Sequence, residues 1–334
     1  VKPSRMVAYD LETTRIAKGT PRPLYLTAYS DEENFILSEP IESIAHLGAI
    51  LSERFLVPQF LDTRFVAWNG NHFDAYMIAA ALLHDPRYVI RPFLTRGKTL
   101  RGMLVMLKDS LNDKKARGWY FVDGIAMLGL AGVSLAKFLK TFAPDFEKLS
   151  EVIDFDSEDF DADNPAHVEY AERDSIGLWH GMRRAEDILM TYFNESLGVT
   201  MGRACIKIFQ AHIPECVTIH QPDAETLRVI RDYAMRGGYC HSVRAYVGPV
   251  WKYDINQAYA AAMRDAKLPA GRAYRAAGLN RFASVYFVRI TARKRNNPVP
   301  FYSKTMIDGR VRFFHAEDGI RDTWITSIEY DQLK

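Results

Sequence analysis

Two acidic residues, Asp10 and Glu12, follow a short apolar run near the start of the sequence. The run at residues 6–9 is typical of a buried strand, and side chains two apart in a strand point to the same face. Two carboxylates that project together repel each other unless a cation lies between them. Carboxylate oxygens favour hard divalent ions such as Mg²⁺ or Mn²⁺. The spacing therefore predicts a metal-binding pair at the end of the first strand.

Three further residues extend this chemistry. Asp74 opens an expected helix directly after a strand at residues 64–68 and a turn, while Tyr170 and Asp174 lie four apart on a long helix. Residues four apart on a helix share a face, so these two side chains project together. Each has a simpler explanation, because an acid stabilises the first turn of any helix and a Tyr–Asp pair also suits a solvated helix surface.

The elements that position these residues follow from hydrophobic periodicity and turn signals. The long helix begins at Asn164-Pro165, where Asn can cap the first turn and Pro suits the first helical position. An acid-rich segment from Asp145 to Asp163 precedes it, and we expect this segment to be a surface excursion. We expect strands at residues 24–30, 34–38, 64–68, 98–108, 117–122, 247–253 and 284–290, and helices at 41–55, 73–85, 200–213 and 222–235.

The acidic residues form three motifs that occur in one order at domain-sized separations. These are D-x-E beginning at Asp10, N-x-x-x-F-D ending at Asp74 and Y-x-x-x-D ending at Asp174. The set resembles the three exonuclease motifs of family B DNA polymerases, within the DEDD exonuclease superfamily. The resemblance implies an α/β fold of the ribonuclease H-like class, with a mixed sheet flanked by helices, followed by the start of an α+β polymerase palm.

The same resemblance implies a two-metal 3′–5′ exonuclease that acts on the 3′ end of single-stranded DNA. Asp10, Glu12, Asp74 and Asp174 would hold two Mg²⁺ or Mn²⁺ ions, and Tyr170 would orient the attacking water. The ions would stabilise the attacking and leaving oxygens of the phosphodiester.

Contacts to single-stranded DNA are implied for Thr13, Asn69 and Phe73, through a hydroxyl, an amide and a ring that meets a base. Asn71 is the alternative to Asn69 if the turn is shifted. The family also has a lysine near its exonuclease site, and Lys148 is the candidate here.

The second half of the sequence resembles the polymerase region of the same family. Residues 253–260 are similar to polymerase motif A, which implies catalytic-metal binding by Asp254 and binding of the incoming nucleotide by Asp254, Ile255 and Tyr259. Gly237 and Gly238 resemble the element that helps to pass the primer between the two active sites.

The resemblance is closest to the protein-primed polymerases of phages and plasmids. It divides the chain into an exonuclease domain at 1–197, the first part of the palm at 198–283 and the start of an insertion region at 284–334. Polymerase motifs B and C do not follow Asp254. We therefore expect the N-terminal part of a longer polymerase, which as given does not polymerise. Expected partners are single-stranded and primer-template DNA, dNTP in the full-length enzyme and a priming terminal protein.

Composition sets wider limits. The 334 residues carry a net charge of +2, but residues 1–199 have 22 Lys and Arg against 29 Asp and Glu, and the remainder has 21 against 12. This asymmetry is compatible with metal chemistry in one half and a polyanion in the other. Three cysteines without C-x-x-C spacing suggest free thiols. With no apolar run of 18 residues and no signal peptide, we expect no membrane segment and a cytoplasmic protein, in the host cytosol if viral.

Two alternatives remain open at this point. A stand-alone DEDD nuclease that acts on DNA or RNA would need the four acids but not the motif A residues. An inactive nucleic-acid-binding relative would keep the fold and the basic surface without metal binding.

Overall fold

In the computed structural model the chain forms two compact units, residues 1–213 and 214–334. The structure describes residues 3–14, 21–94, 99–110, 117–149, 159–216, 218, 220–234, 248–249, 258–265, 272–279, 283, 285–293, 301–307, 310–316 and 319–332. The expected boundary after residue 197 precedes this division, because helix α6 (Met201–Ala211) belongs to the first unit. The assignment of the three regions to an exonuclease, a palm and an insertion stays a prediction.

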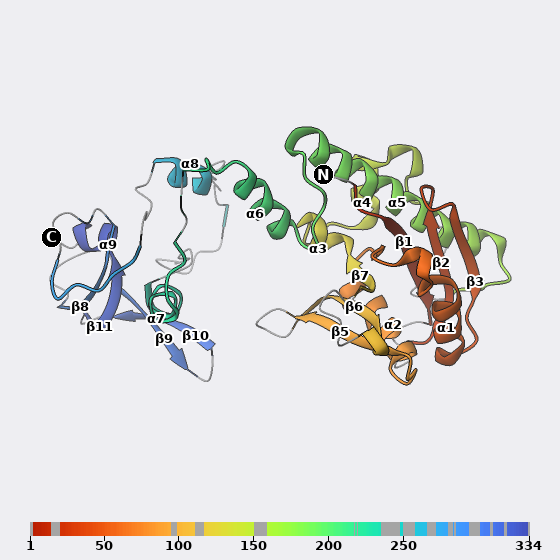
Figure 1. Cartoon of the computed structure of the whole chain (residues 1–334), viewed down its shortest axis with the longest axis horizontal. Coiled ribbons are helices and arrows are strands. Elements are labelled where there is room, and N and C mark those ends of the chain that lie inside the picture. The colour runs from red at the N-terminus through yellow and green to blue at the C-terminus, as the bar shows by residue number, and fades with distance from the viewer. Residues whose placement is uncertain are drawn as a thin grey trace. The chain divides into compact units, whose positions relative to one another are not determined.

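The first unit is built on one mixed sheet of seven strands in the order β3-β2-β1-β4-β7-β6-β5 (Figure 1). Strand β1 pairs antiparallel with β2 and parallel with β4, and β4 pairs parallel with β7. The carboxyl ends of β1, β4 and β7 therefore lie at one edge of the sheet. The strands are β1 Met6–Thr13, β2 Pro23–Ser30, β3 Phe35–Pro40, β4 Arg64–Ala67, β5 Tyr88–Leu94, β6 Leu100–Leu107 and β7 Trp119–Asp123.

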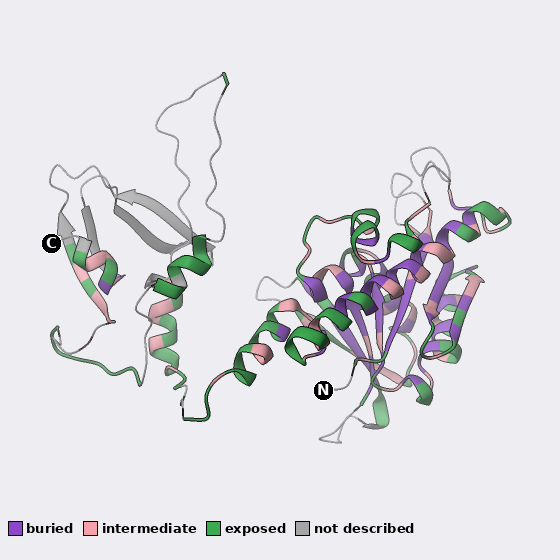
Figure 2. Ribbon diagram, turned by 90° about the horizontal axis from the view of Figure 1, so that it is seen from above, coloured by how far each residue is buried: buried purple, intermediate pink, exposed green. Residues whose placement is uncertain are grey.

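Helices cover both faces of this sheet, and each covering forms its own core. Alternate β1 residues enter the two cores, with Val7 and Tyr9 in one and Met6 and Ala8 in the other. The first core packs α1 and α2 against the sheet, and the second packs α3, α4 and α5. Figure 2 shows the buried sheet strands beneath helix α5. The helices are α1 Ile44–Ile50, α2 Asp74–Leu82, α3 Gly124–Leu128, α4 Leu135–Phe142 and α5 Pro165–Phe193.

The long helix α5 begins as its sequence predicts. The side chain of Asn164 accepts a hydrogen bond from the N–H of Ala166, and Pro165 occupies the first turn. At the other end Asn194 adopts the left-handed conformation, with φ 49°. The helix therefore connects the acid-rich segment before Asn164 with the segment that leads to α6.

Three points of the sequence-based expectations need correction or extension. Strand β1 continues beyond the apolar run through Thr13, so the acids of its motif lie within the strand. Strand β5 and helices α3 and α4 were not predicted. The acid-rich segment before α5 is not wholly a surface excursion. Phe160 is buried and packs 5.2 Å, between ring centroids, from Tyr25.

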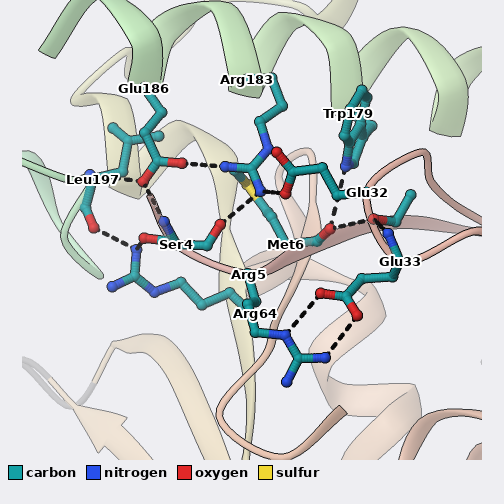
Figure 3. A network of polar contacts seen from close by, with 11 residues as sticks. Ser4, Arg5, Met6, Glu32, Glu33, Arg64, Trp179, Arg183, Glu186 and Leu197 are labelled. Atoms are coloured by element: carbon teal, nitrogen blue, oxygen red, sulfur yellow. Dashed lines mark hydrogen bonds and ion pairs between the residues drawn. The ribbon is translucent and has the colours of Figure 1, made fainter. Parts of the chain in front are cut away.

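A buried polar network joins α5 to the start of β1 (Figure 3). The Glu186 carboxylate accepts hydrogen bonds from the backbone N–H groups of Ser4, at 3.0 Å, and Leu197, at 3.3 Å. It also pairs with Arg183, whose guanidinium contacts Glu32 on the β2–β3 turn. Glu186 is fully buried, so its charge depends on these donors. The network fixes the C-terminal half of α5 and the segment that leaves it.

The second unit contains two antiparallel strand pairs, β8 with β11 and β9 with β10. The expected strand at 284–290 corresponds to β8, which extends further to Arg293. The expected strand at 247–253 lies almost entirely outside the described residues. The elements of this unit are α7 Ala224–Val229, α8 Ala258–Asp265, β8 Phe287–Arg293, β9 Phe301–Ile307, β10 Arg310–Ala316, β11 Gly319–Thr326 and α9 Ser327–Gln332.

Among the described residues, no helix combines the length and the apolar character needed to cross a membrane. Cys205 and Cys216 are exposed free thiols, and Cys240 lies outside the described residues.

Candidate functional site

Strand β1 presents Asp10 and Glu12 on the face that α5 covers. Asp10 lies directly opposite Thr27 of β2, and directly opposite residues of paired strands share a face. The hydroxyl of Thr27 contacts α5 at Ala171 O, 3.1 Å away, and at Ser175 Oγ, 2.7 Å away. Both acids of β1 therefore point towards this part of the helix, as strand alternation predicts.

Helix α5 supplies Tyr170 and Asp174 from the same turns that contact Thr27. Both side chains are buried. The expected shared face is therefore an inward face, so the simpler interpretation of a solvated helical pair is wrong. The bonds from Thr27 hold this part of α5 against the sheet and set the distance between the two pairs of functional groups.

Asp74 reaches the same place from strand β4 and the turn that follows it. Asn69 adopts the left-handed conformation, φ 62° and ψ 18°, and turns the chain into α2. Gly70 is needed next, since a Cβ there would lie 2.8 Å from the Cβ of Ala67. Asp74 is then the first residue of α2, buried, with a hydrogen bond to the Leu11 backbone of β1.

Burial and mutual repulsion raise the pKa values of the four carboxyl groups. Burial raises the pKa of Asp10 well above its ordinary value, and the charges of Glu12, Asp74 and Asp174 raise it further. Burial is also the main reason why the pKa values of Glu12 and Asp74 rise to about 7. Since each acid feels its neighbours, the four form one carboxyl cluster.

Lys148 brings a positive charge to this cluster. Its ammonium pairs with the Asp174 carboxylate at 2.5 Å and lies 4.5 Å from the centre of the Tyr170 ring. Burial lowers the pKa of Lys148, but the charge of Asp174 and the hydrogen bonds with Asp174 and Tyr170 outweigh burial and raise it above its ordinary value. Lys148 therefore stays charged at neutral pH. The pKa of Asp174 remains raised by burial, although Lys148 opposes this shift.

Arg173 positions the segment that carries Lys148. Its guanidinium donates to the backbone carbonyl groups of Asp145, at 3.1 Å, and Glu147, at 3.3 Å. The segment before Lys148 is thus held against the same turn of α5 that bears Asp174. Sequence reasoning gave Lys148 only as a family candidate, and the structure places it beside Asp174 and Tyr170.

The cluster has the donor chemistry of a site for divalent cations. One oxygen of Asp74 and one of Asp174, Oδ1 in each case, are buried without a hydrogen-bond partner. Unpaired buried carboxylate oxygens are costly unless a cation neutralises them, and such oxygens suit Mg²⁺ and Mn²⁺. In the part of the chain that the structure describes, no three acidic, His or Cys side chains are close enough to share one ion. A shared ion would therefore draw the carboxyl groups closer together.

The predicted DNA contacts are next to cluster residues in the sequence or in the turn that precedes one of them. Thr13 ends β1 and is partly exposed, as is Phe73, and Asn69 is exposed in the turn before α2. Asn71 is only 5% exposed, and its backbone N–H donates to Asp123. Accessibility thus favours Asn69 over Asn71 as the residue that meets DNA. The roles of these residues stay predictions.

One buried acid beside the cluster was missed by sequence reasoning. The Asp123 carboxylate ends β7 and accepts three backbone N–H groups, from Asn71 at 3.1 Å, Ile125 at 2.7 Å and Ala126 at 3.2 Å. Its charge contributes to the raised pKa of Asp74. The signal available in the sequence is an acid between a strand and a short helix, which is the pattern of an N-cap.

The predicted polymerase residues can be located only in part. Gly237, Gly238, Asp254 and Ile255 lie outside the described residues. Tyr259 lies on α8 and its side chain is exposed in the second unit. The nucleotide-binding and primer-binding assignments therefore stay predictions.

Comparisons with known proteins identify a family and a fold for this chain. Residues 163–334, more than half of the chain, match the family described as DNA polymerase type B, organellar and viral. No curated protein sequence matches. Phi29 DNA polymerase complexed with primer-template DNA and incoming nucleotide substrates has a similar structure, with TM-score 0.68 and 14% identity over 100% of this chain and 58% of that chain. The same polymerase complexed with single-stranded DNA gives TM-score 0.65 and 14% identity over 98% and 57%.

The TM-scores confirm the predicted fold class. At 14% identity the similarity concerns the fold alone. The chain spans less than two thirds of the length of these polymerase chains.

Proposed function

Because the chain belongs to the organellar and viral type B DNA polymerases, we propose that its first unit is a proofreading 3′–5′ exonuclease. The observation that carries this proposal is the carboxyl cluster of Asp10, Glu12, Asp74 and Asp174, with Tyr170 and Lys148 beside it. These residues come from four separate segments of the chain. The stand-alone nuclease loses its main support, since the family match covers the second unit.

The cluster would hold two divalent cations, Mg²⁺ or Mn²⁺, through its four carboxylates. When bound, such ions stabilise the attacking and leaving oxygens of a phosphodiester under in-line displacement. Glu12 and Asp74, with pKa values of about 7, would release their protons as the cations bind. Binding of the ions should therefore strengthen as the pH rises through 7.

Tyr170 would position the attacking water by hydrogen bonding and would not act as a base. Burial is the first cause that raises its pKa to about 12, and the charge of Asp174 adds to this. The phenol therefore keeps its proton at neutral and mildly alkaline pH. Thr13, Asn69 and Phe73 would hold the 3′-terminal nucleotides at the open side of the cluster.

The larger protein to which this activity would belong is a DNA-directed DNA polymerase of the protein-primed type. Asp254 would bind the metal ions of nucleotidyl transfer, and Ile255 and Tyr259 would line the nucleotide site. Gly237 and Gly238 would lie where the primer passes between the two sites. Primer-template DNA, dNTP and a priming terminal protein are the partners that this proposal includes.

The test is digestion of 5′-labelled single-stranded DNA by the full chain with Mg²⁺ or Mn²⁺. The Asp10→Ala, Glu12→Ala variant should lose at least about a hundredfold in rate, because it removes two of the four carboxylates. The matched control is Glu42→Ala, Asp163→Ala, which removes the same charge from two exposed acids outside the cluster. Equal digestion by both variants would reject the proposed site.

Calorimetry distinguishes the remaining alternative, an inactive nucleic-acid-binding relative. The wild-type chain should bind Mn²⁺ through the cluster, and the control variant should bind it equally. If Mn²⁺ binding does not depend on Asp10 and Glu12, the chain is a binding relative and not a nuclease.

A further inference from the structure

The sequence between Arg87 and Arg117 is strongly basic inside an otherwise acidic unit. It contains nine Lys and Arg residues and two Asp and Glu residues, whereas the rest of residues 1–199 has 13 and 27. The described part of this segment includes strands β5 and β6, a hairpin that forms one side of the sheet. A basic edge on an acidic unit is suited to a polyanion.

Several cations of this hairpin lack an acidic partner among the residues that the structure describes. Arg87 pairs with Asp85, and Arg117 pairs with Asp62. Arg91 and Arg101, by contrast, are exposed and form no ion pair with any described residue. Their charges are available to an outside ligand.

Two aromatic rings share a sheet face with Arg91: Phe93 two residues further along β5 and Tyr120 two strands away on β7. In the strand register, Arg91 lies opposite Leu104 of β6, which lies opposite Tyr120 of β7. Phe93 lies opposite Gly102, two residues further along the same face. The rings of Phe93 and Tyr120 are stacked, with centroids 6.5 Å apart and planes at 25°, and both are partly exposed. An arginine next to open aromatic rings is the combination that binds the backbone and bases of a single strand.

Gly102 explains why the Phe93 ring can lie there. A Cβ on Gly102 would stand 3.4 Å from that ring and 2.8 Å from the backbone oxygen of Phe121. The φ of Gly102, +145°, is also one that side chains disfavour. Phe93 could therefore serve only to cover this glycine, and a test must distinguish that structural role from ligand binding.

The hairpin residues share a sheet face with the carboxyl cluster but lie some distance from it. Strand β5 is four strands away from β1. In register across the sheet, Phe93 is level with Ala8 and Arg91 with Met6, two and four residues before Asp10. At about 4.8 Å per strand and about 3.3 Å per residue, these two residues lie roughly 20–23 Å from Asp10. A single strand stacked at about 3.4 Å per nucleotide would cross this distance in roughly six to seven nucleotides.

We propose that the sheet face formed by Arg91 and Phe93 of the hairpin and Tyr120 of β7 binds single-stranded DNA about six to seven nucleotides from the end that is cleaved. The proposal rests on the proposed exonuclease and adds a second contact to it. The Arg91 guanidinium would contact a phosphate, and the ring of Phe93 would stack on a base. Short substrates would end before they reach this face.

The experiment compares DNA of 3 and 12 nucleotides with the full chain and its variants. Arg91→Gln and Phe93→Leu should each raise KM for the 12-mer by about tenfold and leave the 3-mer unchanged, in line with the value of one base–aromatic or phosphate contact. The Arg91→Gln variant should also reduce the salt dependence of 12-mer binding by about one phosphate contact. Lys140→Gln, which removes an exposed cation from α4, is the matched control.

Each outcome decides the proposal. If Phe93→Leu raises KM equally for the 3-mer and the 12-mer, Phe93 only supports the fold. The Arg91→Gln variant leaves both rings in place, and its KM for the 12-mer then decides whether this face contacts DNA. Unchanged KM for both lengths would overturn the proposal. If the wild-type chain digests neither substrate, the proposed exonuclease fails by itself. Fluorescence anisotropy with the 12-mer, without metal, then tests the hairpin separately, and equal dissociation constants for wild type and variants would reject it.

Discussion

Replacing Lys148 by Met removes the cation that pairs with Asp174 and leaves an apolar side chain of similar length. In the absence of divalent metal we expect the variant to lose much stability at pH 8 and little at pH 5. The Asp174 side chain is only 4% exposed, so without Lys148 it must stay ionised without its partner or take up a proton. Burial already raises the pKa of Asp174, and the substitution raises this pKa further.

The magnitude follows from the cost of that proton. A carboxyl group whose folded pKa is raised loses stability as the pH rises towards that pKa, by at most about 1.4 kcal/mol per pH unit. Three pH units give an upper limit of about 4 kcal/mol, which lies within the roughly 3–5 kcal/mol known for breaking a buried ion pair. Lys148 is 27% exposed, and solvent screening reduces the expectation to about 2–4 kcal/mol.

The assay is thermal unfolding followed by circular dichroism, with a chelator, at pH 5 and pH 8. For a unit of this size the expected loss lowers the Tm of the first unit by about 4–16 °C at pH 8. Lys137→Met, at an exposed position on α4, is the control and should shift the free energy of unfolding by less than about 0.5 kcal/mol at either pH. Mn²⁺ should restore the variant at pH 8. An equal loss at both pH values would refute the reasoning, because it would show that Lys148 acts by packing and not by charge.

Three further predictions concern the same unit. Metal-free wild type should become less stable as the pH rises from about 5 to 8. The folded state raises the pKa values of Glu12 and Asp74 to about 7, so it loses stability as these groups ionise. Asp74→Asn should flatten this pH dependence in thermal melts. Tyr170→Phe should slow hydrolysis at least about tenfold with unchanged DNA binding, and the wild-type rate should show no inflection between pH 8 and 10 because the phenol keeps its proton. Glu186→Gln should destabilise the unit by about 3–5 kcal/mol in urea unfolding, and a loss below about 1 kcal/mol would mean that the network in Figure 3 carries little stability.

The parts of the site that sequence could predict are those fixed by local periodicity. Asp10 and Glu12 share a face because a strand has a period of two, and Tyr170 and Asp174 share one because they are four apart on a helix. Periodicity gives the shared face but not its direction. That α5 turns this face inward depends on Thr27, a contact across 144 residues.

The position of Lys148 had no local signal at all. Its placement depends on Arg173, which holds the carbonyl groups before it, and on the ion pair with Asp174. Both contacts join residues 26 or more positions apart in the sequence. Resemblance to a family could suggest this lysine, whereas residue patterns alone could not.

Strand β5 was missed for a different reason. Pro92 interrupts its apolar pattern, and a proline argues against a central strand because it has no N–H for the ladder. The structure resolves the conflict by placing β5 at the edge of the sheet, where one side of the strand needs no partner. The same edge position leaves the side chain of Arg91 exposed, where a ligand can reach it.

The protonation and the ion pair of the carboxyl cluster have one common cause. Four ionised carboxylates beside one ammonium would leave three negative charges in a buried place, which is too costly to keep. Protons on Glu12 and Asp74 near neutral pH reduce that charge when no metal is bound. Two divalent cations and one phosphodiester would instead bring the whole set to neutrality without any proton. The cluster would therefore be balanced for two metals together with their substrate, and Lys148 takes part in both states because it offsets one carboxylate charge with or without the metals.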